Sequence, residues 1–309
     1  MKYVTIADLS QMIMRNLHKI PHDIDLVVGI PRSGLLPANM ISLYLNTRLT
    51  DIDSFSEHRV YGSGYRMSSR EVRPIKKVLV VDDSVQYGRA IKEAKAKLQE
   101  IEKEYEFLYL APIVSSEGAK LVDIYFTVID DMRVFEWNVF HHSFLANACL
   151  DIDGVLCKDP VIDDDGPVYR DFLKSAEPLF LPTVPVNTLV SCRLEKYREL
   201  TENWLREYNV QYKELILLDF PDKAARVNWG RHGEYKALCY KKSGATLFIE
   251  SSARQAEIIA RISHKPVLCV QTNELLDYGI TFNKLKRFFS THFPRLFKFI
   301  KRLIRKGGQ

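Results

Sequence analysis

Two pairs of acidic residues stand at the ends of apolar runs in this 309-residue chain. Asp82 and Asp83 are adjacent, whereas Asp151 and Asp153 are separated by one residue. In open α/β sheets, ligands bind at the carboxyl ends of the strands, so both pairs are candidates for chemistry. The adjacent pair suits the neighbouring hydroxyls of a sugar, because carboxylates accept hydrogen bonds. Alternate residues of an extended chain point the same way, so the second pair is able to reach one phosphorus atom.

Two loops able to hold an anion accompany the first pair. Five residues separate that pair from a strong helix pattern over 89–104: Ser84, Val85, Gln86, Tyr87 and Gly88. Backbone N–H groups in such a loop, with a helix N-terminus behind them, form a phosphate site. A second loop follows the apolar run 25–30 and carries Arg32, Ser33 and Gly34, where amides and a guanidinium would approach a pyrophosphate. The alternative for the acidic pair alone is a strand that ends in a solvated turn, because short motifs often match by chance.

Together these loops resemble the type I phosphoribosyltransferases, over about residues 20–130. The resemblance implies an α/β domain that binds phosphoribosyl pyrophosphate (PRPP) with Mg²⁺ and displaces pyrophosphate from the anomeric carbon. It also implies that the stretch 53–74, which carries four arginines, is a hood over PRPP; a solvated basic loop is the alternative. Tyr87 stands where this family often has Thr or Ser, and Ala90 stands where it has a later Thr.

The second acidic pair lies in the sequence Asp-Ile-Asp-Gly-Val-Leu, which resembles the first motif of the haloacid dehalogenase (HAD) superfamily. By this resemblance Asp151 is the nucleophile that takes a phosphoryl group, and Asp153 is first the acid and then the base. The resemblance assigns three later residues as the phosphoryl-binding, charge-stabilising and metal-binding side chains, respectively Ser191, Lys236 and Glu250. Mg²⁺ would be held by Glu250 with both aspartates, since like charges otherwise repel the phosphate.

Some residues near these motifs leave alternatives open. Lys241 and Lys242 lie close enough to compete with Lys236 for its role, and two serines follow Glu250 where the family commonly has a second acid. Arg193 could bind a substrate phosphate or have no role. The three aspartates at 163–165 favour a solvated turn over a metal site. About forty residues separate the first two motifs, which leaves no room for a large cap and predicts an open site.

The apolar pattern predicts elements that position both acidic pairs. Short apolar runs alternate with amphipathic stretches, which is typical of parallel α/β sheets. We therefore predict two doubly wound parallel-sheet domains, at 1–145 and 146–277, and a C-terminal amphipathic helical tail at 278–309. The last strand of the second sheet is predicted at 266–271.

Composition and charge separate the tail from the rest of the chain. The five cysteines show no metal spacing and read as reduced thiols, and no signal peptide or membrane-spanning run is evident. Nine of the 44 basic residues lie in 278–309, which has no acidic residue. Apolar residues recur at helical spacing over 283–306 and the other face is basic, which favours an anionic membrane surface. A helix docked on the enzyme is the alternative, and a nucleic-acid partner is not expected because the remaining chain is acidic.

The two resemblances together imply one reaction sequence. A ribosyl transferase leaves a 5-phosphate on its product, and a fused phosphatase could remove it. The arrangement resembles bacterial polysaccharide ribofuranosylation systems, which implies a lipid-linked glycan acceptor and a cytoplasmic enzyme peripheral to the membrane. The base that deprotonates the acceptor is left open among Asp51, Asp53, Glu57 and the first acidic pair. The alternatives are a nucleobase phosphoribosyltransferase fused to a nucleotidase and a PRPP sensor fused to a phosphatase; a homo-oligomer stays open.

Overall fold

A computed structural model describes residues 1–62 and 74–278 of the chain. The contacts divide the chain into two compact units, Met1–Trp137 and Asn138–Gln309. We expected the division after residue 145, but the short 3-10 helix Ser143–Asn147 contacts strands of the second unit. The predicted tail from residue 279 onward and residues 63–73 of the predicted hood lie outside the described residues. Among the described residues, no helix is long and apolar enough to cross a membrane.

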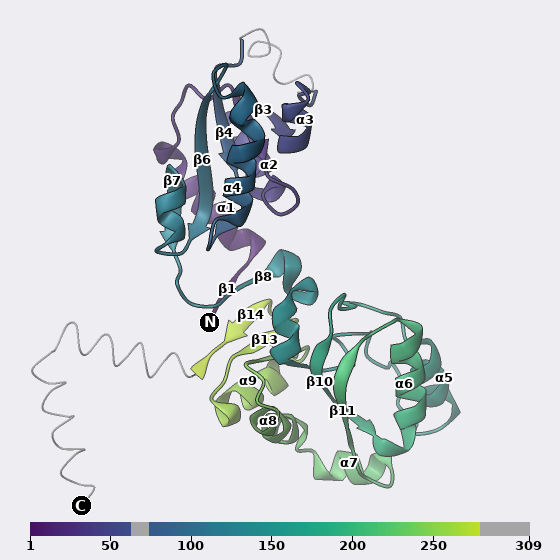
Figure 1. Ribbon diagram of the computed structural model, residues 1–309. Helices are drawn as coiled ribbons and strands as arrows, with labels where there is room; N and C mark the ends of the chain where they lie inside the picture. The colour runs from purple at the N-terminus through teal and green to yellow at the C-terminus, as the bar shows by residue number, and fades with distance from the viewer. Residues whose placement is uncertain (63–73, 279–309) are drawn as a thin grey trace, which may run out of the picture. The chain divides into compact units, whose positions relative to one another are not determined.

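The first unit is a parallel sheet flanked by helices (Figure 1). Its strand order is β3-β2-β4-β6-β5, with β7 paired to β6. The strands are β2 (Leu26–Gly29), β3 (Arg48–Asp51), β4 (Lys77–Val81), β5 (Ser84–Val85), β6 (Glu106–Val114) and β7 (Ile124–Val128). A separate parallel pair is formed by β1 (Lys2–Val4) and β8 (Arg133–Phe135). The apolar run at 25–30 forms β2, whereas β3 and the β1–β8 pair were not among the elements expected from the sequence.

Helices cover both faces of this sheet, as the term doubly wound requires. They are α1 (Ile6–Asn16), α2 (Leu35–Leu45), α3 (Ile52–Ser56) and α4 (Arg89–Leu98). Successive strand residues point to opposite faces. Leu79 and Val81 of β4 accordingly pack with α1 and α2, whereas Val78 and Val80 pack with α3 and α4. Both faces of β4 are therefore buried, and its carboxyl end is the part left to meet a ligand.

The second unit has its own sheet, with strand order β11-β10-β9-β12-β13-β14. The strands are β9 (Ala148–Leu150), β10 (Val186–Leu194), β11 (Tyr212–Leu218), β12 (Leu247–Glu250), β13 (Val267–Cys269) and β14 (Glu274–Leu276). All neighbouring strands are parallel except β13 and β14. Our prediction that the run at 266–271 is the last strand is wrong, because the chain turns at Asn273, in a left-handed conformation, and adds an antiparallel edge strand.

The helices of the second unit bury the central strands. They are α5 (Pro167–Ser175), α6 (Arg198–Glu207), α7 (Lys223–Trp229), α8 (His232–Lys242) and α9 (Ala253–Ser263). Side chains of α8 and α9 pack against β9, β12 and β13. The α5 and α6 helices pack together, and the indole of Trp204 donates to the oxygen of Ala176 at 2.9 Å. The α8 and α9 helices thus fix the ends of β9 and β12, where the second acidic pair and Glu250 lie.

Candidate active sites

Two loops of the first unit meet at the carboxyl edge of its sheet. The loop after β2 lies against the end of β4, because the amide of Ile30 donates to the oxygen of Val81 at 2.9 Å. Gly34, which precedes α2, fits here because it has no side chain: a Cβ would lie 2.5 Å from the Ile30 oxygen and 2.7 Å from the Val81 oxygen. The exposed Arg32 and half-buried Ser33 therefore belong to a loop held beside the acidic pair.

The first acidic pair is buried at the end of β4. Asp82 is 7% exposed and Asp83 is 6% exposed. The amide of Asp83 donates to Oδ1 of Asp82 at 2.9 Å, and the indole Nε1 of Trp137 donates to Oδ2 of Asp83 at 3.0 Å. Burial, together with the neighbouring Asp83 carboxylate, raises the pKa of Asp82 to about 7. Asp82 is therefore suited to exchange a proton near neutral pH. The sequence did not single out Trp137, because it lies 54 residues away.

The loop 84–88, which follows the acidic pair, is held by hydrogen bonds from Ser115. The Ser115 amide donates to the oxygen of Val85 at 2.9 Å, and its hydroxyl donates to the oxygen of Gln86 at 2.8 Å. Gly88 begins α4 in the left-handed region, with φ of 70°. The Tyr87 side chain is 79% exposed. The predicted loop thus leads directly into a helix N-terminus, which is the arrangement that attracts a phosphate.

Most of the other candidate bases in the first unit are already engaged. Asp51 accepts from the amide of Ser54 at 2.9 Å and from the Tyr61 hydroxyl at 2.5 Å. Burial alone would raise the pKa of Asp51, but these hydrogen bonds lower it to about 2. The remaining two form ion pairs, Asp53 with Lys97 and Glu57 with Arg59. The Asp82–Asp83 pair is therefore the best match for a group that takes a proton.

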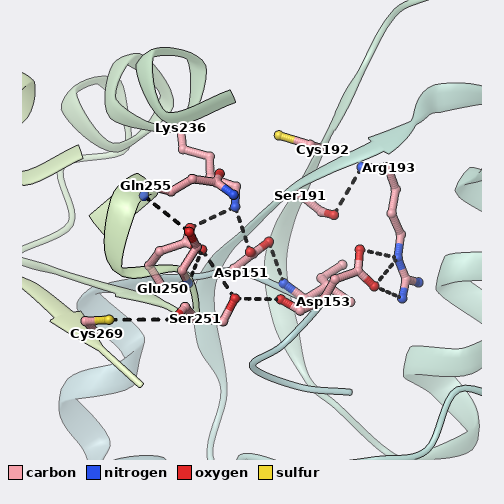
Figure 2. Close-up of polar contacts among 12 residues, drawn as sticks. Asp151, Asp153, Ser191, Cys192, Arg193, Lys236, Glu250, Ser251, Gln255 and Cys269 are labelled. Carbon is pink, nitrogen blue, oxygen red and sulfur yellow. Dashed lines mark hydrogen bonds and ion pairs between the residues drawn. The ribbon is translucent and has the colours of Figure 1, made fainter. Parts of the chain in front are cut away.

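In the second unit, one buried lysine joins two acids from adjacent strands (Figure 2). Nζ of Lys236, on α8, lies 2.6 Å from Oδ2 of Asp151 and 2.7 Å from Oε2 of Glu250. Burial raises the pKa of Asp151 well above its usual value, although the Lys236 charge acts in the opposite direction. The structure brings these three predicted residues together from widely separated parts of the chain. Lys241 and Lys242, the alternatives to Lys236, are exposed.

The second acid of this pair, Asp153, is held by an arginine. Nη2 of Arg193 lies 2.7 Å from Oδ1 of Asp153, and Nε of Arg193 lies 3.2 Å from Oδ1 and 3.1 Å from Oδ2. Arg193 is 1% exposed. Its amide donates to the hydroxyl oxygen of Ser191 at 3.2 Å. The carboxyl-terminal part of β10 thus supplies both the predicted phosphoryl-binding hydroxyl and the partner of Asp153.

A cavity of about 450 Å³ lies at this edge of the second sheet. Its walls include Asp151, Asp153, Ser191 and Lys236, the four residues predicted to carry the reaction. Asp159 also lines it, and the sequence analysis did not identify this residue. Burial, together with Asp153 and Glu250, raises the pKa of Asp159. The cavity is therefore rich in carboxylates, and a phosphate that enters it needs added positive charge.

Magnesium at this edge stays a prediction. The carboxylates of Asp151 and Glu250 and the main-chain oxygen of Asp153 are of the donor type that Mg²⁺ prefers. The hydroxyl of Ser251 donates to that main-chain oxygen at 3.2 Å and lies 3.4 Å from Oε1 of Glu250. Within residues 1–62 and 74–278, no group of three His, Cys, Asp or Glu side chains is arranged to hold a metal. The acids are instead engaged by Lys236 and Arg193, so an ion would need Asp151 and Glu250 to release the ammonium.

The three aspartates at 163–165 do not form the solvated turn that we expected. Asp165 accepts from the Tyr197 hydroxyl at 2.6 Å and from Nζ of Lys196 at 2.7 Å. Asp163 forms an ion pair with Arg226. Asp164 accepts from backbone amides at the start of α5. The run is therefore a structural anchor that ties this loop to the chain around α6 and α7, because each carboxylate finds a different partner.

The serines that follow Glu250 have different surroundings. Ser252 begins α9 as its N-cap, with its hydroxyl oxygen accepting from the amide of Gln255 at 3.4 Å. Ser251 lies against Gly154, where a Cβ would be 2.5 Å from the Ser251 side chain. Both serines line the cavity, and Ser251 is the one whose side chain lies against Gly154.

Comparisons with known proteins give a family match over the first unit and the first ten residues of the second. Residues 3–147 match the family model described as "Phosphoribosyl transferase domain", so the chain carries a phosphoribosyltransferase domain there. No curated protein matches the chain. Solved structures that resemble it include a purine phosphoribosyltransferase from Pyrococcus horikoshii Ot3 (17% identity, TM-score 0.33, 44% of this chain and 92% of that one). Another is the xanthine-guanine-hypoxanthine phosphoribosyltransferase of Helicobacter pylori (16% identity, TM-score 0.34, 45% of this chain and 95% of that one).

Proposed function

We propose that this chain is a bifunctional glycan ribofuranosyltransferase. The first unit would transfer ribose 5-phosphate from PRPP to a glycan hydroxyl and release pyrophosphate. The second unit would then remove the 5-phosphate as a Mg²⁺-dependent HAD-type phosphatase. The observation that carries the proposal is that a phosphoribosyltransferase domain shares one chain with a second sheet whose edge gathers Asp151, Lys236 and Glu250. The second site suits the 5-phosphate that the first reaction leaves behind.

In the transfer step, the first unit mainly positions and stabilises. The carboxylates of Asp82 and Asp83 accept from the ribose hydroxyls, and the amides of the loop 84–88 hold the 5-phosphate. Arg32, Ser33 and Gly34 lie on the loop that would meet the pyrophosphate. Mg²⁺, when bound, would neutralise the charge of the leaving pyrophosphate. Asp82, with a pKa of about 7, takes the proton of the acceptor hydroxyl as the new bond to the anomeric carbon forms.

In the hydrolytic step, two acids divide the work. A carboxylate oxygen of Asp151 forms a bond to phosphorus while the bond from phosphorus to the ribose oxygen breaks, and Asp153 gives that oxygen a proton. Water then attacks the same phosphorus and passes its proton to Asp153, the bond to Asp151 breaks, and phosphate leaves. Lys236 and Ser191 stabilise and bind the phosphoryl oxygens, with Mg²⁺, when bound, supplying further positive charge.

An assay with PRPP, Mg²⁺ and candidate acceptors tests this sequence of reactions. With a lipid-linked glycan, wild-type protein is expected to release pyrophosphate first and phosphate second. The alternative, a nucleobase phosphoribosyltransferase fused to a nucleotidase, predicts pyrophosphate release only with a nucleobase. The PRPP-sensor alternative predicts PRPP binding without pyrophosphate release from any acceptor. Pyrophosphate release that requires a nucleobase would overturn the glycan proposal.

We place the enzyme in the cytoplasm, peripheral on the membrane. The support is the basic amphipathic sequence pattern of residues 283–306, because such segments bind anionic lipid surfaces. Deleting residues 283–309 is expected to abolish co-sedimentation with vesicles that contain anionic lipid. Vesicles of neutral lipid are the control, and unchanged binding by the truncated chain would remove the membrane proposal.

A further inference from the structure

Arg193 is the most completely buried basic residue in contact with the proposed phosphatase acids. It lies in β10, two residues after Ser191, and is 1% exposed. Figure 2 shows its guanidinium facing the Asp153 carboxylate, with hydrogen bonds from both Nε and Nη2. A planar guanidinium that donates through two nitrogens fixes both the position and the plane of a carboxylate. A lysine would fix only the position.

The guanidinium also contacts three groups other than Asp153. Nη1 lies 3.4 Å from the hydroxyl of Thr201 on α6, and Nη2 lies 3.2 Å from Sγ of Cys157. The ring of Phe172, on α5, lies 5.9 Å from the guanidinium carbon. Three separate segments therefore hold Arg193, so its geometry belongs to the fold and does not depend on a substrate.

This arrangement argues against direct binding of substrate by Arg193. The walls of the cavity include Asp153, Ser191 and Cys192, whereas Arg193 is not among the described residues that line it. A phosphate in the cavity would meet Asp153 first. A charge buried this deeply is stable only when it is paired, so turning the guanidinium toward the cavity would leave Asp153 without its partner.

We infer that Arg193 is a positioning residue that fixes the Asp153 carboxyl group for proton transfer to the leaving oxygen; this inference rests on the proposed phosphatase function. Bond breaking from phosphorus to an alkyl oxygen needs that proton, because an alkoxide is a poor leaving group. A nitrophenolate leaves without protonation. Loss of the Arg193–Asp153 geometry therefore penalises alkyl phosphates far more than activated aryl phosphates.

Two substrates and two substitutions test the inference. Ribose 5-phosphate is the alkyl substrate and p-nitrophenyl phosphate is the aryl substrate, each measured with full-length protein and Mg²⁺. For Arg193→Met, we expect kcat on ribose 5-phosphate to fall about 10²- to 10⁴-fold, the usual contribution of general acid catalysis, and kcat on the aryl substrate to fall less than about tenfold. Arg193→Lys keeps the positive charge but cannot donate through two nitrogens in one plane. For this variant we expect an intermediate loss of kcat on the alkyl substrate alone.

A matched control removes a different arginine near the same cavity. Nη1 of Arg226 donates to the oxygen of Cys192 at 3.0 Å, and its guanidinium pairs with Asp163, so it does not hold Asp153. Arg226→Met is expected to lower thermal stability and to leave the ratio of the two kcat values unchanged. In an Asp153→Asn background, adding Arg193→Met should cause no further loss on the alkyl substrate, because the two residues act as one unit.

Three outcomes would overturn the inference. A rise in KM with unchanged kcat in folded Arg193→Lys would mean that Arg193 binds the phosphate. Equal losses of kcat on both substrates would mean that Arg193 has a general structural role. The same conclusion would follow if Arg193→Met did not fold and folded Arg193→Lys kept the wild-type ratio of the two kcat values. Wild-type protein that hydrolyses neither substrate would overturn the phosphatase proposal itself, which is a distinct result.

Discussion

The two acidic edges of this protein differ in the charge that surrounds them. In the first unit, Asp82 and Asp83 are in contact with each other and with the neutral indole of Trp137, and neither carboxylate forms an ion pair within the described residues. In the second unit, each acid of the pair has a buried cation, Lys236 for Asp151 and Arg193 for Asp153.

This difference matches two kinds of chemistry. Carboxylates that form no ion pair can accept from sugar hydroxyls or take a proton. Burial, together with the Asp83 carboxylate, raises the pKa of Asp82 to about 7. Carboxylates that already contact cations are fixed in place before a substrate arrives, which suits a nucleophile and a proton carrier that must act on one phosphorus. Similar sequence patterns at strand ends therefore produce two kinds of site. The carboxylates of the first site form no ion pair with any residue that the structure describes, and those of the second are held in place by cations before a substrate binds.

The largest expected effect is a loss of phosphate release without a loss of pyrophosphate release. Asp151→Asn removes the proposed nucleophile, so release of phosphate should fall by about 10⁴-fold or more, as happens when an enzyme loses its nucleophile. Pyrophosphate release from PRPP should stay within about twofold of wild type, because Asp151 lies in the other unit. A coupled assay for both products checks this. A parallel loss of pyrophosphate release would show that the two activities share one site.

The cations of the second site should matter for stability. Lys236→Met leaves the buried carboxylates of Asp151 and Glu250 facing each other, which should cost about 3–5 kcal/mol in the free energy of unfolding. Thermal and urea denaturation would measure the change. Lys242→Met is the matched control, because Lys242 is an exposed residue of the same helix. Equal stability of the two variants would mean that the Lys236 bridge is not a folding contact.

The close contact between the two loops of the first unit should limit substitution at Gly34. In Gly34→Ala, the new Cβ collides with the oxygens of Ile30 and Val81, so the loops must separate by a fraction of an ångström. Overpacking of this kind costs about 1–3 kcal/mol, so PRPP affinity should fall by about tenfold. Isothermal titration with PRPP measures this. An affinity of Gly34→Ala equal to that of wild type would argue against the contact.

The smallest effect concerns the missing cation at Asp82. The raised pKa of Asp82 means that the folded state binds its proton more tightly than the unfolded state does, so stability is lost as pH rises from about 4 to about 7. Asp82→Asn keeps the oxygen that accepts from Asp83 but removes this loss. The variant should be more stable than wild type at pH 8 and about equally stable near pH 4, measured by urea denaturation. A gain that does not depend on pH would contradict this explanation.

Much of the candidate chemistry could be predicted from sequence because it lies at the ends of apolar runs. The acidic pairs, the loop 84–88, Ser191 and Glu250 lie at strand ends, whereas Lys236, also expected from the sequence, reaches the second edge from α8. The antiparallel edge strand, the β1–β8 pair and the anchoring role of the aspartates at 163–165 could not be predicted. Each of these features depends on a contact with a residue elsewhere in the chain, and the local pattern of apolar residues does not predict such contacts.

The sequence by itself determined two α/β units, the residues at their strand ends and the basic pattern of the tail. Only the tertiary structure decided which cation meets which acid. Trp137 reaches Asp83 across 54 residues, Lys236 reaches Asp151 across 85, and Arg193 reaches Asp153 across 40. The physical reason is that spacing along a strand fixes where a carboxylate points, whereas its charge environment is set by side chains that packing brings from elsewhere. The contrast between the two acidic edges is therefore a property of the fold.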